Sequence, residues 1–150
     1  VLGIDVSQHA VDCATRNAEL NNLQDVVKFE CHNAFDVLGT WSREGKQYDV
    51  VILDPPAFTK SRGTVNAAIR GYKEINLRGL KMVKPGGYFA TCSCSHYMSE
   101  EQLKKTVLEA AHDARRTLRQ IEVRTQSCDH PILWNSDESY YLKFFIFQVV

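Results

Sequence analysis

The sequence lacks several features that would narrow its function at once. It has no net charge, because 18 basic residues balance 18 acidic ones, so nothing in its charge favours nucleic acid or a membrane surface as a partner. No apolar run approaches the roughly 20 residues that a membrane-spanning helix needs. We find no internal repeat and no low-complexity segment. What remains is a chain of 150 residues, long enough for one domain with a hydrophobic core.

Paired cysteines are also missing. The number of cysteines, five, is odd, and several fall inside predicted helices or strands. This usage is typical of a reducing compartment, so we expect a cytoplasmic protein. Neither Cys92-x-Cys94 nor Cys128-x-His130 has the paired spacing of a zinc site, and no metal is predicted.

The most informative stretch that is present runs from Tyr48 to Phe58. Residues 50–53 are an unbroken apolar run, which predicts a central parallel strand covered on both faces. Asp54 follows, and Pro55 restricts it to extended geometry. In open α/β sheets ligands bind at this edge, so Asp54 is a candidate site residue. The alternative is an ordinary strand exit at which proline acts as a stop.

Strands and helices alternate along the chain, which predicts a doubly wound α/β domain with two strands at its end. The predicted strands are residues 2–4, 26–31, 50–53, 88–92, 118–124 and 140–149. The predicted helices are residues 7–20, 36–46, 67–83 and 99–115. Ser7 and Ser99 are expected as helix caps. Asn76, in the middle of an apolar helix face, is expected to bond the backbone near Asp54.

Two other strand ends carry polar candidates. Asp5 ends the first strand, where an acid accepts hydrogen bonds from ribose hydroxyls or simply favours the start of a helix. Asn33 and Ala34 follow the second strand. The Asn33 amide suits an adenine edge, or it is a turn residue.

Four motifs in order carry a family resemblance: Leu53-Asp-Pro-Pro-Ala-Phe58, Arg70-Gly-Tyr-Lys-Glu-Ile-Asn76, Pro85-Gly-Gly87 and Cys92-Ser-Cys-Ser95. The chain resembles class I S-adenosylmethionine-dependent methyltransferases, and more specifically the large-subunit (23S) rRNA cytosine-C5 methyltransferases. The resemblance implies a Rossmann-like sheet in the order 3-2-1-4-5-7-6 with an antiparallel last strand.

The resemblance also shows what is not in the sequence. Residues 1–150 match strands 2 to 7, that is, the C-terminal part of a catalytic domain, and strand 1 with its Gly-rich cofactor loop is absent. The family's RNA-binding PUA domain is absent too. The chain starts directly in a strand, so we interpret it as a fragment whose sheet would be split.

By the resemblance the cofactor is S-adenosylmethionine, with Asp5, Asn33, Ala34 and Asp54 in contact with it, although the family commonly has an acid at the Asn33 position. Cys94 would be the nucleophile that attacks carbon 6 of cytosine, and Asp54 the acid at the pyrimidine edge.

Other cysteines and a histidine remain as alternatives for the chemistry. Cys92 is the rival nucleophile, although its deeper place in the strand favours an inert thiol. Cys13 and Cys31 are expected in the core. His96 either tunes Cys94 or is polar surface.

The expected partner is rRNA. Pro55, Phe58 and Lys60 in the elbow and the following loop, with Arg70 and Lys73 on the next helix, are the candidate substrate contacts. Phe58 either stacks on a base or packs under the loop. The Phe and Ile residues of the last strand form either core or the face of a homodimer.

Three other functions stay open. Asp-Pro-Pro also resembles the motif of amino-group methyltransferases, which need no cysteine. A truncated, non-catalytic domain would serve only in dimerisation or RNA docking. A dehydrogenase would explain Asp5 but not Asp54 together with Cys94.

Overall fold

The computed structural model, which describes residues 1–59 and 61–150, contains two separate sheets. A two-stranded sheet lies in the compact unit Val1–Glu44, and a four-stranded sheet lies in the compact unit Gly45–Val150. Within the described residues, no helix has both the length and the apolar character required to cross a membrane. Lys60, one of the predicted substrate contacts, lies outside the described residues.

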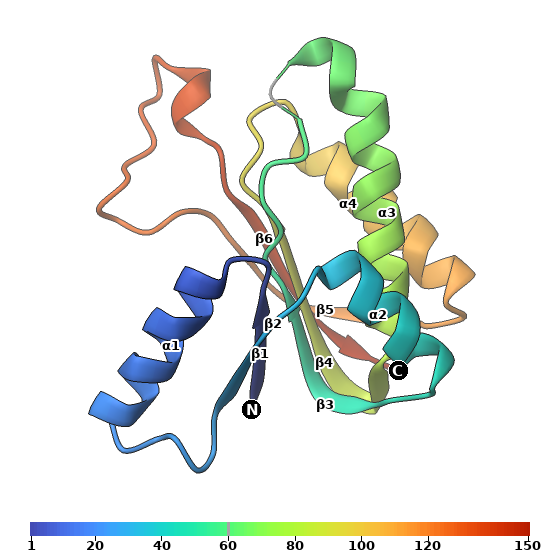
Figure 1. Ribbon diagram of the computed structural model, residues 1–150. Helices are drawn as coiled ribbons and strands as arrows, with labels where there is room; N and C mark the ends of the chain where they lie inside the picture. The colour runs from blue at the N-terminus through green and yellow to red at the C-terminus, as the bar shows by residue number, and fades with distance from the viewer. Residues whose placement is uncertain (60) are drawn as a thin grey trace. The chain divides into compact units, whose positions relative to one another are not determined.

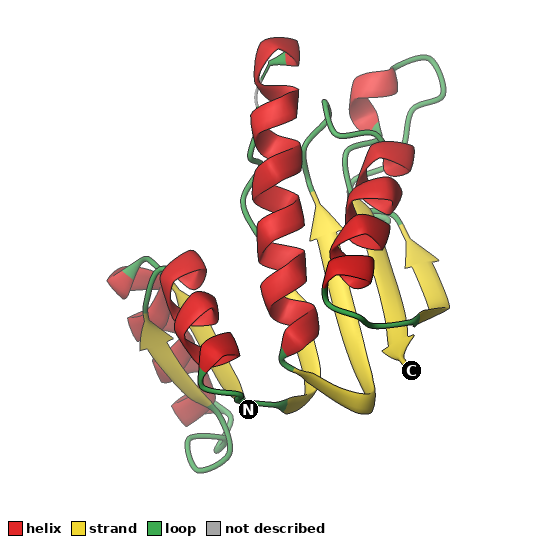
Figure 2. Cartoon of the chain, turned by 90° about the vertical axis from the view of Figure 1, so that its right-hand side faces the viewer, coloured by secondary structure: helices red, strands yellow, loops and turns green. Residues whose placement is uncertain are grey.

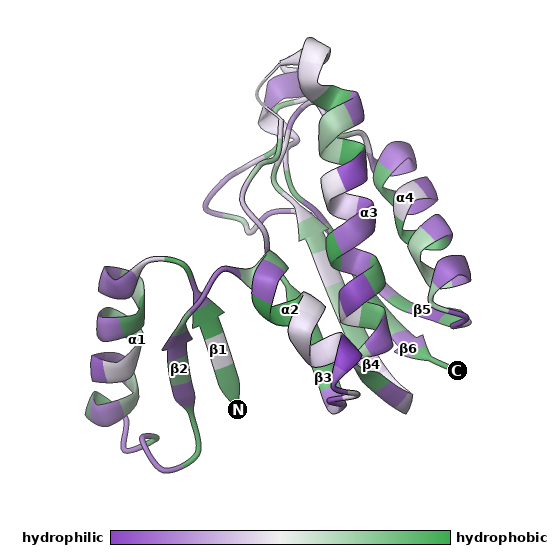
Figure 3. Ribbon diagram, turned by 45° about the vertical axis from the view of Figure 1, so that its right-hand side comes forward, coloured by the Kyte–Doolittle hydropathy of each residue, from purple (hydrophilic) through white to green (hydrophobic). Residues whose placement is uncertain are grey.

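The first unit is a β-α-β-α segment. Its elements are β1 (Leu2–Asp5), α1 (Gln8–Leu20), β2 (Lys28–Cys31) and α2 (Ala34–Arg43). The two strands are parallel, and Asp5 pairs with Cys31 at their carboxyl ends. Figure 3 shows that β1 is largely hydrophobic whereas β2 is largely hydrophilic.

The start of α1 confirms the predicted cap, because the Ser7 side chain accepts from the backbone N–H of Ala10. Val11 and Ala18 form the buried stripe of this helix. The expectation that Cys13 and Cys31 belong to the core is wrong, since both are exposed. Cys13 lies two positions from Val11, which on a helix turns it away from the buried face.

The second unit holds the larger sheet. Its elements are β3 (Tyr48–Leu53), the short 3₁₀ turn η1 (Arg62–Thr64), α3 (Val65–Lys81), β4 (Val83–Ser93), α4 (Glu100–Asp113), β5 (Leu118–Arg124), the short 3₁₀ turn η2 (Asp137–Ser139) and β6 (Lys143–Val149). The strand order is β3-β4-β6-β5. The β3–β4 pair is parallel, and β6 is antiparallel to both of its neighbours. Figure 1 shows β6 inserted beside β4 although a helix and a strand separate them in sequence.

These pairings confirm the predicted fold. The neighbours within each sheet are those of the order 3-2-1-4-5-7-6 with strand 1 left out, so the sheet is split as expected. The expectation that residues 50–53 are covered on both faces is wrong for this chain. β3 lies at an edge of its sheet, and the side chains of Val50 and Ile52 are exposed because α3 and α4 both pack on the opposite face (Figure 2).

The core of the second unit lies between that helical layer and the sheet. It contains Ala68 and Tyr72 of α3, Leu103 and Val107 of α4, and Phe145 of β6. This core fixes the helices relative to the carboxyl end of β4, where Cys94 lies.

Asn76 does not reach the backbone near Asp54 as predicted. It is fully buried, and its amide donates to the Tyr72 carbonyl one turn back in α3, 2.7 Å away, while its Oδ1 has no partner among the described residues. A second difference concerns the strand predicted at residues 88–92, because β4 begins earlier, at Val83, and its register against β3 is irregular between Tyr48 and Val50.

Candidate active site

Parallel pairing brings the two catalytic candidates of the second unit to the same sheet edge. Leu53 at the end of β3 pairs with Thr91 of β4, so Asp54 lies next to Cys92. The Cys92 thiol donates to Oδ1 of Asp54 over 3.0 Å, with the Leu53 carbonyl 3.6 Å away. Asp54 is exposed, whereas the following Pro55 is buried. The elbow therefore presents the carboxylate and anchors the chain behind it.

Cys92 is held as a neutral thiol. It is 4% exposed, and burial, together with its hydrogen bond to the Asp54 carboxylate, raises the pKa of the Cys92 thiol far above its usual range. A thiol in this state is a hydrogen-bond donor to Asp54 and a poor nucleophile. This agrees with the expectation that Cys92 is inert.

Cys94 lies in a different environment. It comes directly after Ser93, the last residue of β4, and, unlike the buried Cys92, it is half-buried. Two serines fix the turn around it. The Ser93 hydroxyl donates to the Tyr72 hydroxyl over 2.8 Å and accepts from the Ser95 N–H, and the Ser95 hydroxyl donates to the Thr59 carbonyl over 2.9 Å.

The position of His96 does not support a role in tuning Cys94. Its side chain is exposed, and its ring packs edge-on against Tyr97 with the centroids 5.2 Å apart. The geometry fits the alternative of polar surface.

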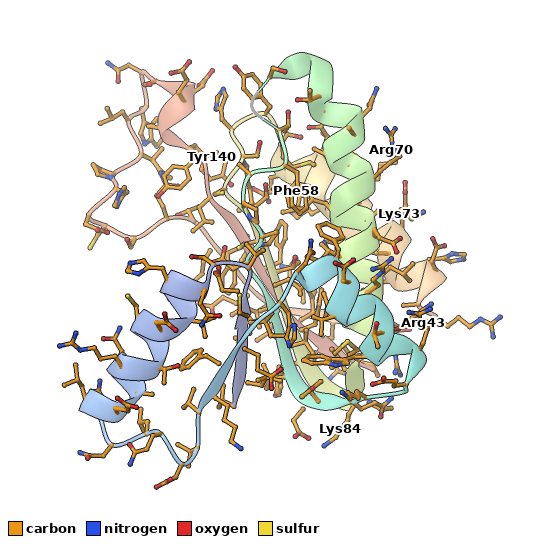
Figure 4. The ribbon with its side chains drawn as sticks, viewed as in Figure 1. Arg43, Phe58, Arg70, Lys73, Lys84 and Tyr140 are labelled. Atoms are coloured by element: carbon orange, nitrogen blue, oxygen red, sulfur yellow. The ribbon has the colours of Figure 1, made fainter. Side chains whose placement is uncertain are left out.

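The contacts of the Phe58 ring fit the alternative in which this residue packs under the loop. It is half-buried against the core, its centroid lies 4.6 Å from that of Tyr72, and it lies where a Cβ on Gly71 would come within 3.2 Å of it. Figure 4 labels Phe58 on the segment that joins β3 to α3.

The two cations of α3 that were predicted as substrate contacts differ from each other. Arg70 is exposed on the outer side of α3 (Figure 4). Lys73 instead forms ion pairs with Asp113 at 3.0 Å and Glu109 at 3.6 Å, both on α4. The hydrogen bond to Asp113 raises the pKa of Lys73. Lys73 therefore joins two helices, a role that the sequence analysis did not anticipate.

In the first unit, the cofactor candidates meet at the carboxyl edge of β1 and β2. One oxygen of the Asp5 carboxylate accepts from the Ser7 N–H over 2.7 Å, and the Asp5 carbonyl accepts from the His32 N–H over 2.9 Å. Asn33 caps α2, since its side-chain oxygen accepts from the Phe35 N–H over 2.9 Å. This is the local role left open as an alternative, and Ala34 is the first residue of that helix.

Sequence reasoning missed one charged group at the site. Lys143 begins β6, pairs with Ser93 and is only 2% exposed. Its position in an otherwise apolar strand, Lys-Phe-Phe-Ile-Phe, was the available signal, because a lysine flanked by core residues needs a partner.

Comparisons with known proteins agree on the fold and on a family. The model of the methyltransferase domain family matches residues 1–144. The ribosomal RNA large subunit methyltransferase I of Vibrio parahaemolyticus is 42% identical over 154 residues, covering 100% of this chain and 38% of that protein. The protein of the same name from Aeromonas hydrophila is 40% identical, covering 95% of this chain and 36% of that protein. The chain thus spans little more than a third of the length of these curated relatives.

Solved structures repeat the architecture at low identity. A Streptococcus mutans protein assigned as a SAM-dependent methyltransferase has a TM-score of 0.83 at 20% identity, over 99% of this chain and 38% of that chain. The O-methyltransferase from Bacillus cereus in complex with SAH has a TM-score of 0.62 at 15% identity, over 99% of this chain and 62% of that chain.

Proposed function

We propose that this chain, which belongs to the methyltransferase domain family, is part of an enzyme that transfers a methyl group from S-adenosylmethionine to large-subunit rRNA. The names of its relatives support the rRNA substrate. We further propose that the methyl group goes to C5 of a cytosine, and that Cys94 forms the covalent bond that this chemistry requires.

The observation that carries the proposal is the contrast between two cysteines at one sheet edge. Cys92 is buried and donates to Asp54, whereas Cys94 is half-buried just beyond the strand. Asp54 is therefore held in place by one thiol, and the second thiol is left to react. An enzyme that methylates an amino group needs no second cysteine.

Each group has a definite task in this reaction. Cytosine C5 is a poor nucleophile until a thiolate adds to C6. The Cys94 sulfur forms a bond to C6, and the electron pair of the C5–C6 double bond becomes available at C5. In this proposal Asp54 faces the pyrimidine edge, and a proton shared between its carboxyl group and the ring nitrogen, carried by the acid or by the base, stabilises the charge that develops. After methyl transfer a base removes the C5 proton, the double bond re-forms and the Cys94 thiolate leaves.

The residues of the first unit fit the cofactor's adenosine half. Asp5 is exposed and uses one carboxylate oxygen for the Ser7 N–H, so its second oxygen is able to accept from ribose hydroxyls. The exposed Asn33 retains its amide group as a donor for an adenine edge while its oxygen caps α2. When bound, S-adenosylmethionine supplies an electrophilic methyl group.

Trapping the covalent intermediate tests this proposal. RNA that carries 5-fluorocytidine at the target cannot lose a proton from C5, so the cysteine adduct should persist. We expect the full-length protein to give a complex with this RNA that resists denaturing electrophoresis, and the Cys94→Ala variant to give none. If the Cys94→Ala variant still formed the covalent complex and the Cys92→Ala variant did not, Cys92 would be the nucleophile and the assignment of Cys94 would be overturned.

A further inference from the structure

Lys143 is the one buried cation whose contacts lie next to Cys94 in the part of the chain that the structure describes. Its ammonium donates to the Ser95 carbonyl over 2.7 Å and to the Tyr141 carbonyl over 3.0 Å. It also lies 5.6 Å from the centroid of the Tyr140 ring. The antiparallel pairing of β6 with β4 places its backbone opposite Ser93, immediately before Cys94.

A buried ammonium is costly unless negative charge compensates it. Burial lowers the pKa of Lys143, whereas the negative charge that Cys94 carries when ionised, together with that of Glu100, opposes this change. The Glu100 carboxylate already accepts from the Tyr140 hydroxyl over 2.9 Å and pairs with Lys104 at 2.9 Å. No direct Lys143–Glu100 ion pair is present among the described contacts. The charge of Lys143 therefore remains available to an anion at Cys94.

We propose that Lys143 is a positioning residue of the candidate active site, whose buried ammonium holds the Ser95 carbonyl and stabilises the thiolate of Cys94. Its catalytic meaning rests on the proposed function, but the interaction itself does not. One ammonium contact fixes the turn that presents the sulfur, and its charge favours the reactive form of that sulfur.

Other ionisable groups surround Cys94 and Lys143, and their charges also affect the ionisation of the Cys94 thiol. Those near Cys94 or Lys143 are Asp54, Tyr72, Cys92, His96, Glu100, Lys104 and Tyr140. Asp54 and Glu100 are acids, whose negative charge disfavours a thiolate. Burial, with the Glu100 carboxylate, raises the pKa of Tyr140 to about 12, so this phenol stays neutral near neutral pH. Among these groups Lys143 is the buried cation.

The alkylation rate of Cys94 measures this interaction without any methyl transfer. The full-length protein would be treated with iodoacetamide across the neutral to alkaline range, and the modification of Cys94 followed by mass spectrometry, which resolves it from the exposed Cys13, Cys31 and Cys128. In the Lys143→Met variant we expect iodoacetamide to alkylate Cys94 about tenfold more slowly at neutral pH, and the alkylation rate to reach half of its maximum at a higher pH.

Two further substitutions separate charge from hydrogen bonding. Lys143→Gln keeps a donor for the Ser95 carbonyl but removes the charge, so it should shift the pH profile as Lys143→Met does. It also keeps the test available should the methionine variant not fold. Lys143→Arg keeps the charge and should restore a profile close to that of the unmodified protein.

The matched control is Lys104→Met, which removes an equal charge from an exposed lysine that pairs with Glu100. We expect a much smaller shift there, because water and salt screen the charge of an exposed lysine. The proposal is overturned by an unchanged profile in Lys143→Gln with intact melting behaviour, or by an equal shift in Lys104→Met. Trapping on 5-fluorocytidine RNA reports the proposed function separately, since Cys94 can be activated by Lys143 and still not be the nucleophile.

Discussion

In the proposed site, the Cys92–Asp54 pair shows how a buried thiol can hold a candidate catalytic carboxylate in place. The carboxylate is exposed at a proline elbow, and the hydrogen bond from the buried thiol ties it to β4. Because the carboxylate is exposed and a thiol is a weak donor, this bond contributes less than the about 1.5–3 kcal/mol of a desolvated charge-assisted hydrogen bond. Replacing Cys92 should therefore affect both stability and the orientation of Asp54.

The raised pKa of the Cys92 thiol predicts how stability depends on pH. The folded state retains this proton, so the contribution is fully present below the unfolded cysteine pKa of about 8.5 and is lost as pH rises above it. Between pH of about 8 and about 9.5 the advantage of the unmodified protein over Cys92→Ser should fall by about 1 kcal/mol. Serine keeps a donor but does not titrate in this range.

Chemical denaturation at several pH values provides the measurement. The unmodified protein and the Cys92→Ser variant share every other titrating group, so the difference between their free energies of unfolding reports the contribution of Cys92. A difference that stays constant over this range would contradict the protonated thiol.

At the scale of elements, close packing of α3 on the sheet positions the site. A Cβ on Gly79 would lie 2.9 Å from Cδ1 of Leu53 and 3.1 Å from Cε2 of Phe89. The glycine thus allows the helix to approach β3 directly before Asp54 and β4 before Cys92. The apolar pattern of the helix predicted its buried face, but nothing local in the sequence identified this contact.

Gly79→Ala should therefore be destabilising although alanine favours helix. The intrinsic gain of about 1 kcal/mol is offset by overpacking, which typically costs about 1–3 kcal/mol. We expect a net loss of about 1 kcal/mol in thermal or denaturant unfolding. Lys81→Ala, at an exposed position of the same helix, should change stability by less than about 0.5 kcal/mol. An alanine variant as stable as the unmodified protein would show that the contact is loose.

The sequence predicted existence and type of the elements better than their contacts. The bounds of β5 and the capping box of α4 at Ser99 agree with the prediction, because hydrophobic periodicity and capping chemistry are local. Asn76 and Lys143 were missed or misplaced because their partners come from tertiary packing. β2 begins at Lys28, later than predicted, since Val26 and Val27 bond back to Leu23 in a turn.

At the scale of the whole molecule, strand order came from the family resemblance and not from periodicity, which says nothing about which strands are neighbours. The resemblance also accounts for the split sheet and for the exposed apolar side of β3. Zero net charge gives these residues little electrostatic attraction to RNA phosphates. In our proposal these residues supply the cofactor contacts and the chemistry.

The most direct test of the central claim maps the methylated base. The full-length protein, its Cys94→Ala variant and a control with the exposed Cys128 replaced by alanine would be incubated with labelled S-adenosylmethionine and unmethylated large-subunit rRNA. We predict 5-methylcytosine from the unmodified protein and from Cys128→Ala, and none from Cys94→Ala. Methyl transfer that survives loss of Cys94, especially to an exocyclic amine, would contradict the thiolate mechanism and favour amino-group methylation at the Asp-Pro-Pro elbow.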